Sequence, residues 1–265
     1  MDDVVKSFID FIFGKGFITA ATDAVVVDLS TDSVSLINNI SESVAQPIGA
    51  VLLTIYLVLE LMEKLTTDNF SAEQFVKLLI KFAFGQIIIT NITGWSFMFM
   101  NAGVSFMMQI VDASGGISQA TVDMGGIDNS LGGIIKGIAL IAQLIIPFLI
   151  SAVLRVAIYF MGFGRALEMI LRSMMAPIGC ADVITGGTNS SGIRYMKRML
   201  GISLQGGIMI AIIAASALFI NELLVGEGVF TIGNTVFLMK YLGVVAAMVG
   251  ILGQSKSIAF EIVGA

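Results

Sequence analysis

The chain is poor in charged residues and lacks most residue types on which metal sites, disulfides and acid–base catalysis depend. Of its 265 residues 12% are charged, against about 25% in an average soluble domain. It has no histidine, which excludes imidazole chemistry and histidine-ligated metals. Its single cysteine, Cys180, excludes an internal disulfide and a cysteine-rich metal site. The sequence contains no catalytic triad, carboxylate pair or cofactor fingerprint, so we expect neither an enzyme nor a cofactor.

The rest of the composition is strongly apolar. Hydrophobic residues make up 57% of the chain, and the mean hydropathy is +0.96. A soluble protein of this size covers itself with polar side chains, and this chain has too few of them. The composition therefore predicts an all-α, polytopic membrane protein. The net charge of −5 excludes a global basic field that would attract nucleic acid.

Five apolar segments are long enough to cross a bilayer core of about 30 Å as helices, although four to six crossings are compatible with the pattern. In the second segment Asn91, Thr93 and Gly94 interrupt the apolar run. We favour one crossing there, with a break or an interfacial continuation, over a hairpin of two helices. The five segments cover residues 44–62, 75–111, 134–163, 204–224 and 236–252.

Local signals mark the ends and bends of these segments. Pro47 falls in the first turn of the first segment, where its missing N–H costs nothing. Ser71 and Gln74 form a capping box at the start of the second. Pro147 and the pair Gly162 and Gly164 predict kinks in the third. Residues 177–192 look irregular, and residues 193–200 form a short basic amphipathic turn or helix.

The region before residue 44 has a different character. Between Val4 and Phe17 apolar residues recur with helical spacing. This pattern predicts an amphipathic helix lying in the membrane interface or, alternatively, a helix packed in a soluble cap. An acidic connection with Asp28 and Glu42 follows. We therefore divide the chain into an extracytoplasmic segment, residues 1–43, and a transmembrane helical domain, residues 44–265.

Basic residues are distributed unevenly between the connections. Lys64 and Lys77 flank the first one, whereas residues 112–133 and 222–234 contain no Lys or Arg. Because Lys and Arg favour the cytoplasmic side, five crossings place the N-terminus outside and the C-terminus in the cytoplasm. Lys240 departs from this pattern and is expected to snorkel. Most bases cluster around a cytoplasmic loop predicted at residues 173–203: Arg172, Arg194, Lys197 and Arg198.

Four charged residues fall inside or next to the third apolar segment: Arg155, Arg165, Glu168 and Arg172. The last three are spaced i,i+3 and i,i+4, so on a helix they share a face and form a charge-compensated ladder. Charges in a membrane are costly and often functional, but we favour a structural ion-pair network that locks helices or subunits together. Arg155 has no local partner, so it needs either an aqueous cavity or a partner from elsewhere. Candidate partners are Glu60, Glu222 and the same region of another subunit.

The predicted cytoplasmic loop offers a contact surface. Arg194, Lys197 and Arg198 lie on one helical stripe that fits a cytoplasmic partner, nucleic acid or anionic lipids, or serves as an ordinary anchor. We group Asp182 with them, although a cap or turn role suits a lone acid. Residues 187–192 have the Gly-x4-Gly spacing of a phosphate-binding loop but lack the following Lys and Ser or Thr, so we reject nucleotide binding. We assign no redox role to Cys180.

Several short motifs resemble those of the TrbL-type polytopic membrane subunit of type IV secretion and conjugation systems. They are Ala-Pro-Ile-Gly-Cys-Ala-Asp at 176–182, Ser-Gly-Ile-Arg-Tyr-Met-Lys at 191–197 and Leu-Gln-Gly at 204–206, with Arg165 and Glu168 upstream. The resemblance is best from about residue 147 to residue 210. It implies a channel or platform component of the bacterial cytoplasmic (inner) membrane. It also implies secretion-system partners that include ATPases and pilus components, with nucleic acid only as a translocated substrate.

The sequence alone leaves three functions open. A translocation component, for DNA or protein, is the preferred hypothesis. A secondary transporter is disfavoured because no inverted repeat is visible. A structural assembly scaffold without its own pore fits the sequence equally well. We expect a homo-oligomer, because small residues at helix-packing spacing, such as Gly243 with Ala247, allow close contact between helices.

Overall fold

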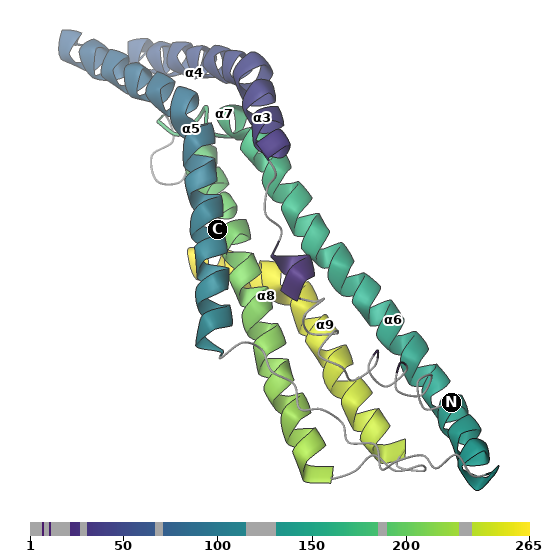
Figure 1. The fold of residues 1–265 in the computed structure, drawn as a ribbon. Coiled ribbons are helices and arrows are strands. Elements are labelled where there is room, and N and C mark those ends of the chain that lie inside the picture. The colour runs from purple at the N-terminus through teal and green to yellow at the C-terminus, as the bar shows by residue number, and fades with distance from the viewer. Residues whose placement is uncertain are drawn as a thin grey trace. The chain divides into compact units, whose positions relative to one another are not determined.

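The computed structural model describes residues 7, 11, 22–26, 31–66, 71–114, 131–184, 190–227 and 235–265. All regular secondary structure in these ranges is helical (Figure 1), as predicted. The predicted amphipathic helix at residues 4–17 lies almost entirely outside the described residues. The helices are α3 (Thr31–Ile40), the π-helix η1 (Ser41–Ala45), α4 (Gln46–Thr66), α5 (Ala72–Ala113), α6 (Leu131–Met174), α7 (Ala176–Gly179), α8 (Ser191–Glu227) and α9 (Thr235–Val263).

Five helical stretches are long and apolar enough to cross a membrane, which confirms the predicted number of spans: Thr31–Thr66, Ala72–Ala113, Leu144–Met174, Ser191–Ile220 and Met239–Val263. They differ in how much of their apolar 18-residue stretch is buried within the chain. The share is 56% for the span in α8 and between 17% and 28% for the other four. The α8 span therefore packs mainly against protein, whereas the other four offer most of their apolar surface to lipid or to other subunits.

The first span begins earlier than the sequence predicted. Residues 31–43, predicted as an acidic connection, form α3 and the start of η1, which continue into α4. The prediction that Pro47 occupies the first turn of the span is therefore wrong. Pro47 instead follows a π-turn, in which the Gln46 N–H donates to the Ser41 carbonyl. A proline deprives the preceding turn of a hydrogen bond, and a local π-turn is a common way to absorb that loss.

The second span is a single helix of 42 residues, so neither a break nor a hairpin occurs at residues 91–94. The Asn91 side chain donates to the Ile87 carbonyl at 2.8 Å, and the buried Thr93 hydroxyl bonds to Ser41. These polar groups are thus satisfied by the helix itself or by a neighbouring helix, and α5 remains continuous. The Ser71 hydroxyl accepts the Gln74 N–H at 3.3 Å, as predicted for the N-cap.

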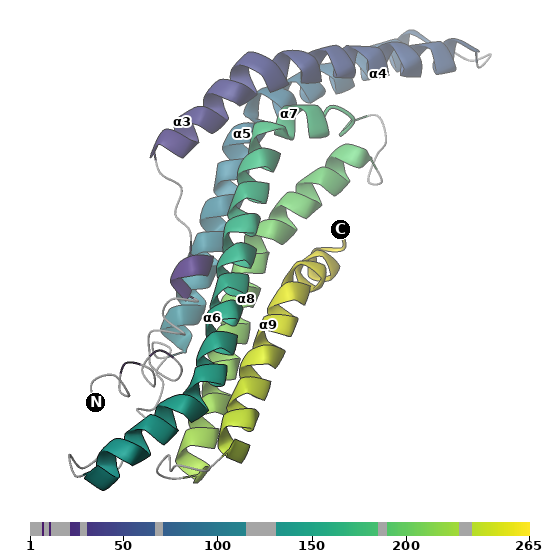
Figure 2. The same ribbon diagram turned by 90° about the vertical axis from the view of Figure 1, so that its right-hand side faces the viewer.

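The later helices are longer than the apolar segments that predicted the spans. In α6 the helix continues past Gly162 and Gly164 to Met174, as the helical pattern of residues 165–175 predicts, and Figure 2 shows a bend in its N-terminal half, which contains Pro147. The predicted short basic helix at residues 193–200 is wrong as a separate element, because α8 runs unbroken from Ser191 to Glu227. Glycines at 201, 206 and 207 do not end it. Part of the predicted irregular stretch forms the short helix α7.

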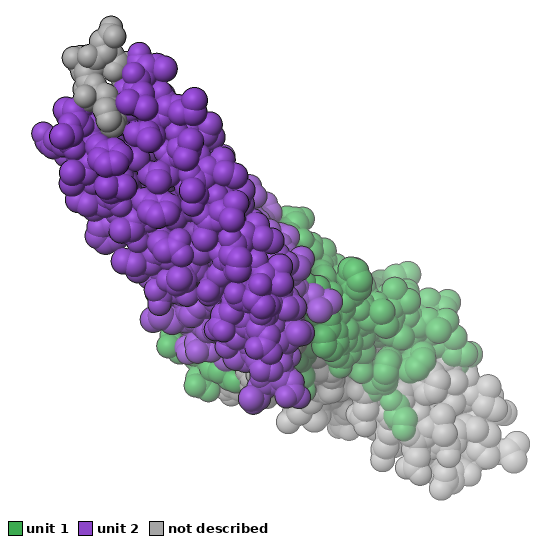
Figure 3. Space-filling model, turned by 90° about the horizontal axis from the view of Figure 1, so that it is seen from above, with its two compact units in different colours: residues 1–27, 106–164, 206–255 green, residues 28–105, 165–205, 256–265 purple. Residues whose placement is uncertain are grey.

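The chain divides into two compact units (Figure 3). Unit 1 contains residues 1–27, 106–164 and 206–255, and unit 2 contains residues 28–105, 165–205 and 256–265. In unit 2 helices approach closely at glycines. A Cβ on Gly103 would lie 2.5 Å from the Ser203 carbonyl oxygen, and one on Gly49 would lie 2.7 Å from that of Pro177. By contrast, the predicted packing residues Gly243 and Ala247 in unit 1 are exposed.

Candidate functional site

Two cations of unit 2 converge on Glu168, in the C-terminal part of α6. Its carboxylate accepts hydrogen bonds from Arg172 Nε and Nη2 at 3.1 and 3.0 Å, so the i,i+4 pair that the spacing predicts is formed. Lys256 Nζ, on α9, lies 2.8 Å from Oε1 and 2.7 Å from Oε2 of the same carboxylate. One carboxylate thus serves two cations, and the cluster keeps one excess positive charge.

The end of α8 that carries the basic stripe joins this cluster through Tyr195. Its hydroxyl donates to the Arg172 carbonyl at 2.7 Å, which satisfies one of the unpaired carbonyls in the last turn of α6. The Arg172 guanidinium lies 5.8 Å from the centre of the Tyr195 ring, within the range of a cation–π contact. The ring also packs on Gly179, where a side chain would collide with it. Tyr195 therefore fixes the start of α8 against the end of α6.

Two further predicted residues lie close to these groups in the chain. Arg165 is buried, with 4% of its surface exposed, so it faces protein and not lipid. Asp182 Oδ2 accepts hydrogen bonds from the backbone N–H and the hydroxyl of Ser191, at 3.2 and 2.9 Å. Together with the Ser190 hydroxyl, which accepts the Ile193 N–H, it caps the N-terminus of α8. Asp182 thus has the capping geometry that suits a lone acid.

The three bases of the stripe are exposed on α8. Lys197 Nζ donates to the Gly264 carbonyl at 3.2 Å, and Gly201, one turn further along, packs against Phe260. The last residues of α9 thus lie beside the first turns of α8. Arg194 and Arg198 project from the same stripe. Residues 185–189, which contain the first glycine of the rejected phosphate-loop pattern, lie outside the described residues.

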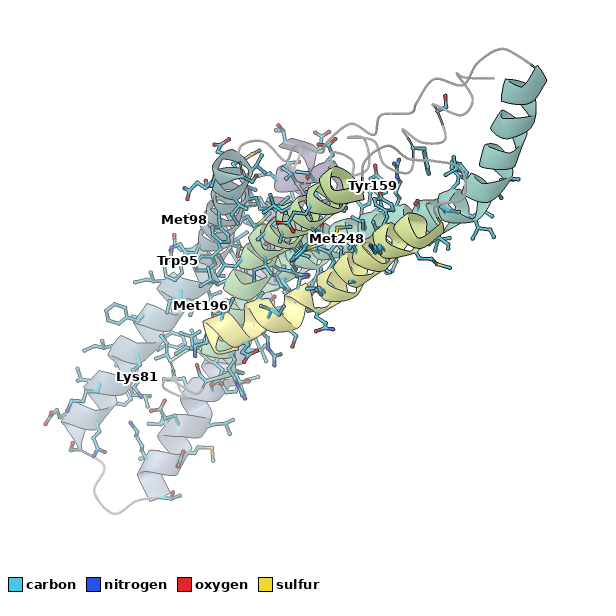
Figure 4. All side chains as sticks on the ribbon, turned by 90° about the horizontal axis from the view of Figure 1, so that it is seen from below. Lys81, Trp95, Met98, Tyr159, Met196 and Met248 are labelled. Carbon is cyan, nitrogen blue, oxygen red and sulfur yellow. The ribbon has the colours of Figure 1, made fainter. Side chains whose placement is uncertain are left out.

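A second charge cluster, which the sequence analysis missed, joins α4 and α5. Glu60 Oε1 lies 3.2 Å from Lys64 Nζ and 2.9 Å from Lys81 Nζ, and Figure 4 shows Lys81 turned toward α4. A small pocket with about 220 Å³ of empty space opens beside this cluster, lined by Leu53, Leu57, Glu60, Leu78, Lys81, Phe82 and Ile184. Glu60 was one suggested partner of Arg155, but its bonds to two lysines account for its charge.

In unit 1 Arg155 is held by an aromatic ring and a backbone carbonyl. Its guanidinium carbon lies 3.9 Å from the centre of the Phe11 ring, and Nη2 donates to the Phe11 carbonyl. The same ring packs on Phe148, with 4.5 Å between ring centres. Phe148, Arg155 and Gly162 are spaced by seven residues and share one face of α6. At Gly162 a side chain would overlap the Ala24 carbonyl oxygen, so Phe11 and Ala24 both lie against this face.

The only cysteine offers no reactive thiol. Cys180 is buried beside Ala176, Ile92 and Met199. Burial raises the pKa of its thiol to about 12, so it stays protonated at neutral pH. Among the described residues there is also no group of three or more cysteine, aspartate and glutamate side chains that could hold a metal ion.

The family comparison agrees with the membrane spans. The TrbL/VirB6 plasmid conjugal transfer like protein family matches residues 27–177, more than half of the chain. No curated protein and no solved structure matches this chain. The matched region includes α3 to α6 and overlaps the motifs of the earlier resemblance only at residues 147–177. This chain belongs to the TrbL/VirB6 plasmid conjugal transfer-like family and is a multi-pass membrane component of a conjugal transfer or type IV secretion system.

Proposed function

We propose that this protein forms part of the channel or platform through which a type IV secretion machine moves DNA or protein across the cytoplasmic membrane. The observation that carries the proposal is the coincidence of the family match at residues 27–177 with five helices able to cross a membrane. Conjugal transfer requires a path through the membrane, and polytopic helices are the elements that line such paths. The energy for transport comes from partner ATPases.

We infer that the N-terminus lies outside the membrane and the C-terminus in the cytoplasm. Lys64 and Lys77 flank one connection on the proposed cytoplasmic side, and Arg194, Lys197 and Arg198 mark the other. The chain segments 112–133 and 222–234, without any base, belong to the opposite side. This orientation exposes the basic stripe to the secretion ATPases and other cytoplasmic partners.

We infer in addition that the protein assembles as a cyclic homo-oligomer. In four of the five spans less than a third of the apolar window is buried within one chain. Large apolar side chains cover the outer side of α6, as expected for contact with lipid. On α9, by contrast, Gly243, Gly250 and Gly253 have open space around them, which leaves room for a neighbouring helix to approach closely. Native mass spectrometry of the detergent-solubilised protein tests this: a stable monomer would contradict it.

The channel role is tested by trapping the substrate during transfer. Photo-activatable amino acids are placed at exposed positions of α9, such as Ala246, in a donor strain with the complete secretion system. We expect the transferred molecule to cross-link to this chain in active cells and not in a strain whose secretion ATPase is inactive. Normal assembly and transfer without cross-linking at any exposed helix position would support the scaffold. Solute uptake by a purified monomer in vesicles would support the transporter.

A further inference from the structure

Five basic side chains of unit 2 gather where α6 ends, α8 begins and α9 ends. We call this the basic helix-end surface: Arg172, Arg194, Lys197, Arg198 and Lys256. Contacts between the three helices hold it together. Glu168 joins Arg172 to Lys256, and Tyr195 joins α8 to the Arg172 carbonyl. Between α8 and the end of α9, Lys197 donates a hydrogen bond to the Gly264 carbonyl, and Phe260 packs against Gly201.

The basic helix-end surface carries more positive than negative charge. Its five cations face three carboxylates on the same segments, Glu168, Asp182 and Glu261. Glu168 is already shared by two cations, and Asp182 is committed to capping α8. Arg194, Lys197 and Arg198 are exposed, and the Lys256 side chain is 43% exposed. The surface is therefore open to an anionic ligand, which would complete the charge balance.

The lengths of the helices place these bases at the depth of lipid head groups. The α8 span, Ser191–Ile220, has 30 residues, and the α6 span, Leu144–Met174, has 31. At 1.5 Å per residue each is about 45 Å long, which matches a bilayer with both head-group layers and exceeds its core of about 30 Å. Arg172 and Arg194 each lie within one turn of a span end. Lys256 lies seven residues before the end of its span and extends its flexible side chain toward the same layer.

We propose that the basic helix-end surface binds the phosphate of an anionic phospholipid of the surrounding bilayer, such as phosphatidylglycerol or its two-phosphate relative cardiolipin. Arg194 and Arg198, one turn apart on α8, bind the phosphate directly. Lys256 and Arg172 add positive charge beside it. Basic pockets between membrane helices are a common site for such head groups. This inference does not depend on the translocation role.

Nucleic acid fits the same surface less well. Sequence-independent binding of single strands needs aromatic rings on which bases stack. The two rings at this surface are used within the protein: Tyr195 packs on Gly179 and bonds to Arg172, and Phe260 packs on Gly201 below Lys256. Arg and Lys side chains alone recognise phosphate, and in a membrane protein the lipid phosphates at this depth are always present.

The test uses the full-length protein purified in detergent and native mass spectrometry with added phosphatidylglycerol or phosphatidylcholine. We expect phosphatidylglycerol to remain bound and phosphatidylcholine to dissociate. The double variant Arg194→Gln, Arg198→Gln should bind phosphatidylglycerol about thirtyfold more weakly, because each base near the membrane surface contributes roughly fivefold. Lys240→Gln removes one positive charge from the exposed N-terminal part of α9, away from this surface, and should leave binding unchanged.

A second variant acts in the opposite direction. Glu168→Gln releases Arg172 and Lys256 from their shared carboxylate and should tighten phosphatidylglycerol binding several-fold. The proposal is overturned if the double variant binds like the wild type, or if Lys240→Gln weakens binding equally. It is also overturned if inorganic phosphate displaces the lipid, which would indicate a site for a free anion. Displacement of the lipid by oligothymidine, with loss of oligothymidine binding in the double variant, would identify a nucleic-acid site instead.

Discussion

Units 1 and 2 hold positive charge in an apolar chain in two different ways. In unit 2 the Glu168 carboxylate balances Arg172 and Lys256 through short ion pairs. In unit 1 Arg155 rests on the Phe11 ring and donates to its carbonyl. An ion pair joins two opposite charges, whereas the Phe11 ring and carbonyl hold the guanidinium through a cation–π contact and a hydrogen bond. The comparison predicts that the Glu168 cluster depends on its ion pairs and that Arg155 depends on its contact with Phe11.

The largest effect is expected from loss of the shared carboxylate. Glu168→Gln leaves two neighbouring cations without compensation. Breaking a fully buried pair costs about 3–5 kcal/mol. Because these side chains are between 23% and 43% exposed, we expect a loss of about 2 kcal/mol in the free energy of unfolding. Adding Lys256→Gln should recover part of the loss, as measured by thermal unfolding in detergent. Unchanged stability in the single variant would show that the cluster does not hold unit 2.

The next effect tests packing in unit 1. Gly162→Ala forces a side chain against the Ala24 carbonyl oxygen and should lower the free energy of unfolding by about 1–2 kcal/mol. Gly164→Ala is the matched control, because Gly164 has open space around it. This second change should be neutral or stabilising, since alanine favours a helix by up to about 1 kcal/mol. If both variants behave alike, the N-terminal segment does not pack on this face of α6.

A smaller effect distinguishes the contact of Arg155 with the Phe11 ring from the ion pair between Glu168 and Lys256. A double-mutant cycle with Arg155→Gln and Phe11→Leu should give a coupling energy of about 1 kcal/mol, typical of a partly buried cation–π contact. The coupling should persist at high salt, because ring and guanidinium are in direct contact. The corresponding cycle for Glu168 and Lys256 should weaken as salt rises, since Lys256 is partly exposed. Equal salt dependence of the two cycles would contradict the comparison.

The smallest effect concerns Cys180. Because burial raises the pKa of its thiol to about 12, the folded state binds this proton more tightly than the unfolded state does. Cys180 therefore leaves stability unchanged below about pH 8.5 and lowers it as the pH rises toward 12. At pH 8 a maleimide should label Cys180 only after unfolding, whereas a cysteine at exposed Ser257 in a Cys180→Ala background should react at once. Rapid labelling of folded Cys180 would show that its site opens.

Local signals in the sequence were sufficient to predict the number of spans and the start of α5. Five apolar runs predicted five spans, and Ser71 marked the start of α5, because hydropathy and capping depend on neighbouring residues. The boundary predicted at residue 200 was wrong, because α8 continues through Gly201, and that glycine makes a close contact with Phe260. A glycine alone does not distinguish a break from a contact.

The partners of the charges were beyond the reach of local reasoning. The i,i+4 spacing predicted the pairing of Glu168 with Arg172, but Lys256 lies 88 residues away from Glu168. Phe11 lies 144 residues from Arg155 and carries no charge, so a search for acidic partners passed over it. Only the apolar surroundings of each charge signalled that a partner had to exist.

The central claim is that the chain crosses the cytoplasmic membrane with its basic helix ends inside, and the two ends of α5 test it most directly. Glu73 and Asp112 lie near opposite ends of this one helix, and both are exposed. Single cysteines are placed there in a Cys180→Ala background, and intact cells are treated with a membrane-impermeant maleimide, with only the outer membrane permeabilised. We predict labelling of Asp112→Cys in intact cells and of Glu73→Cys only after lysis. Labelling of Glu73→Cys but not of Asp112→Cys would invert the orientation and contradict the account.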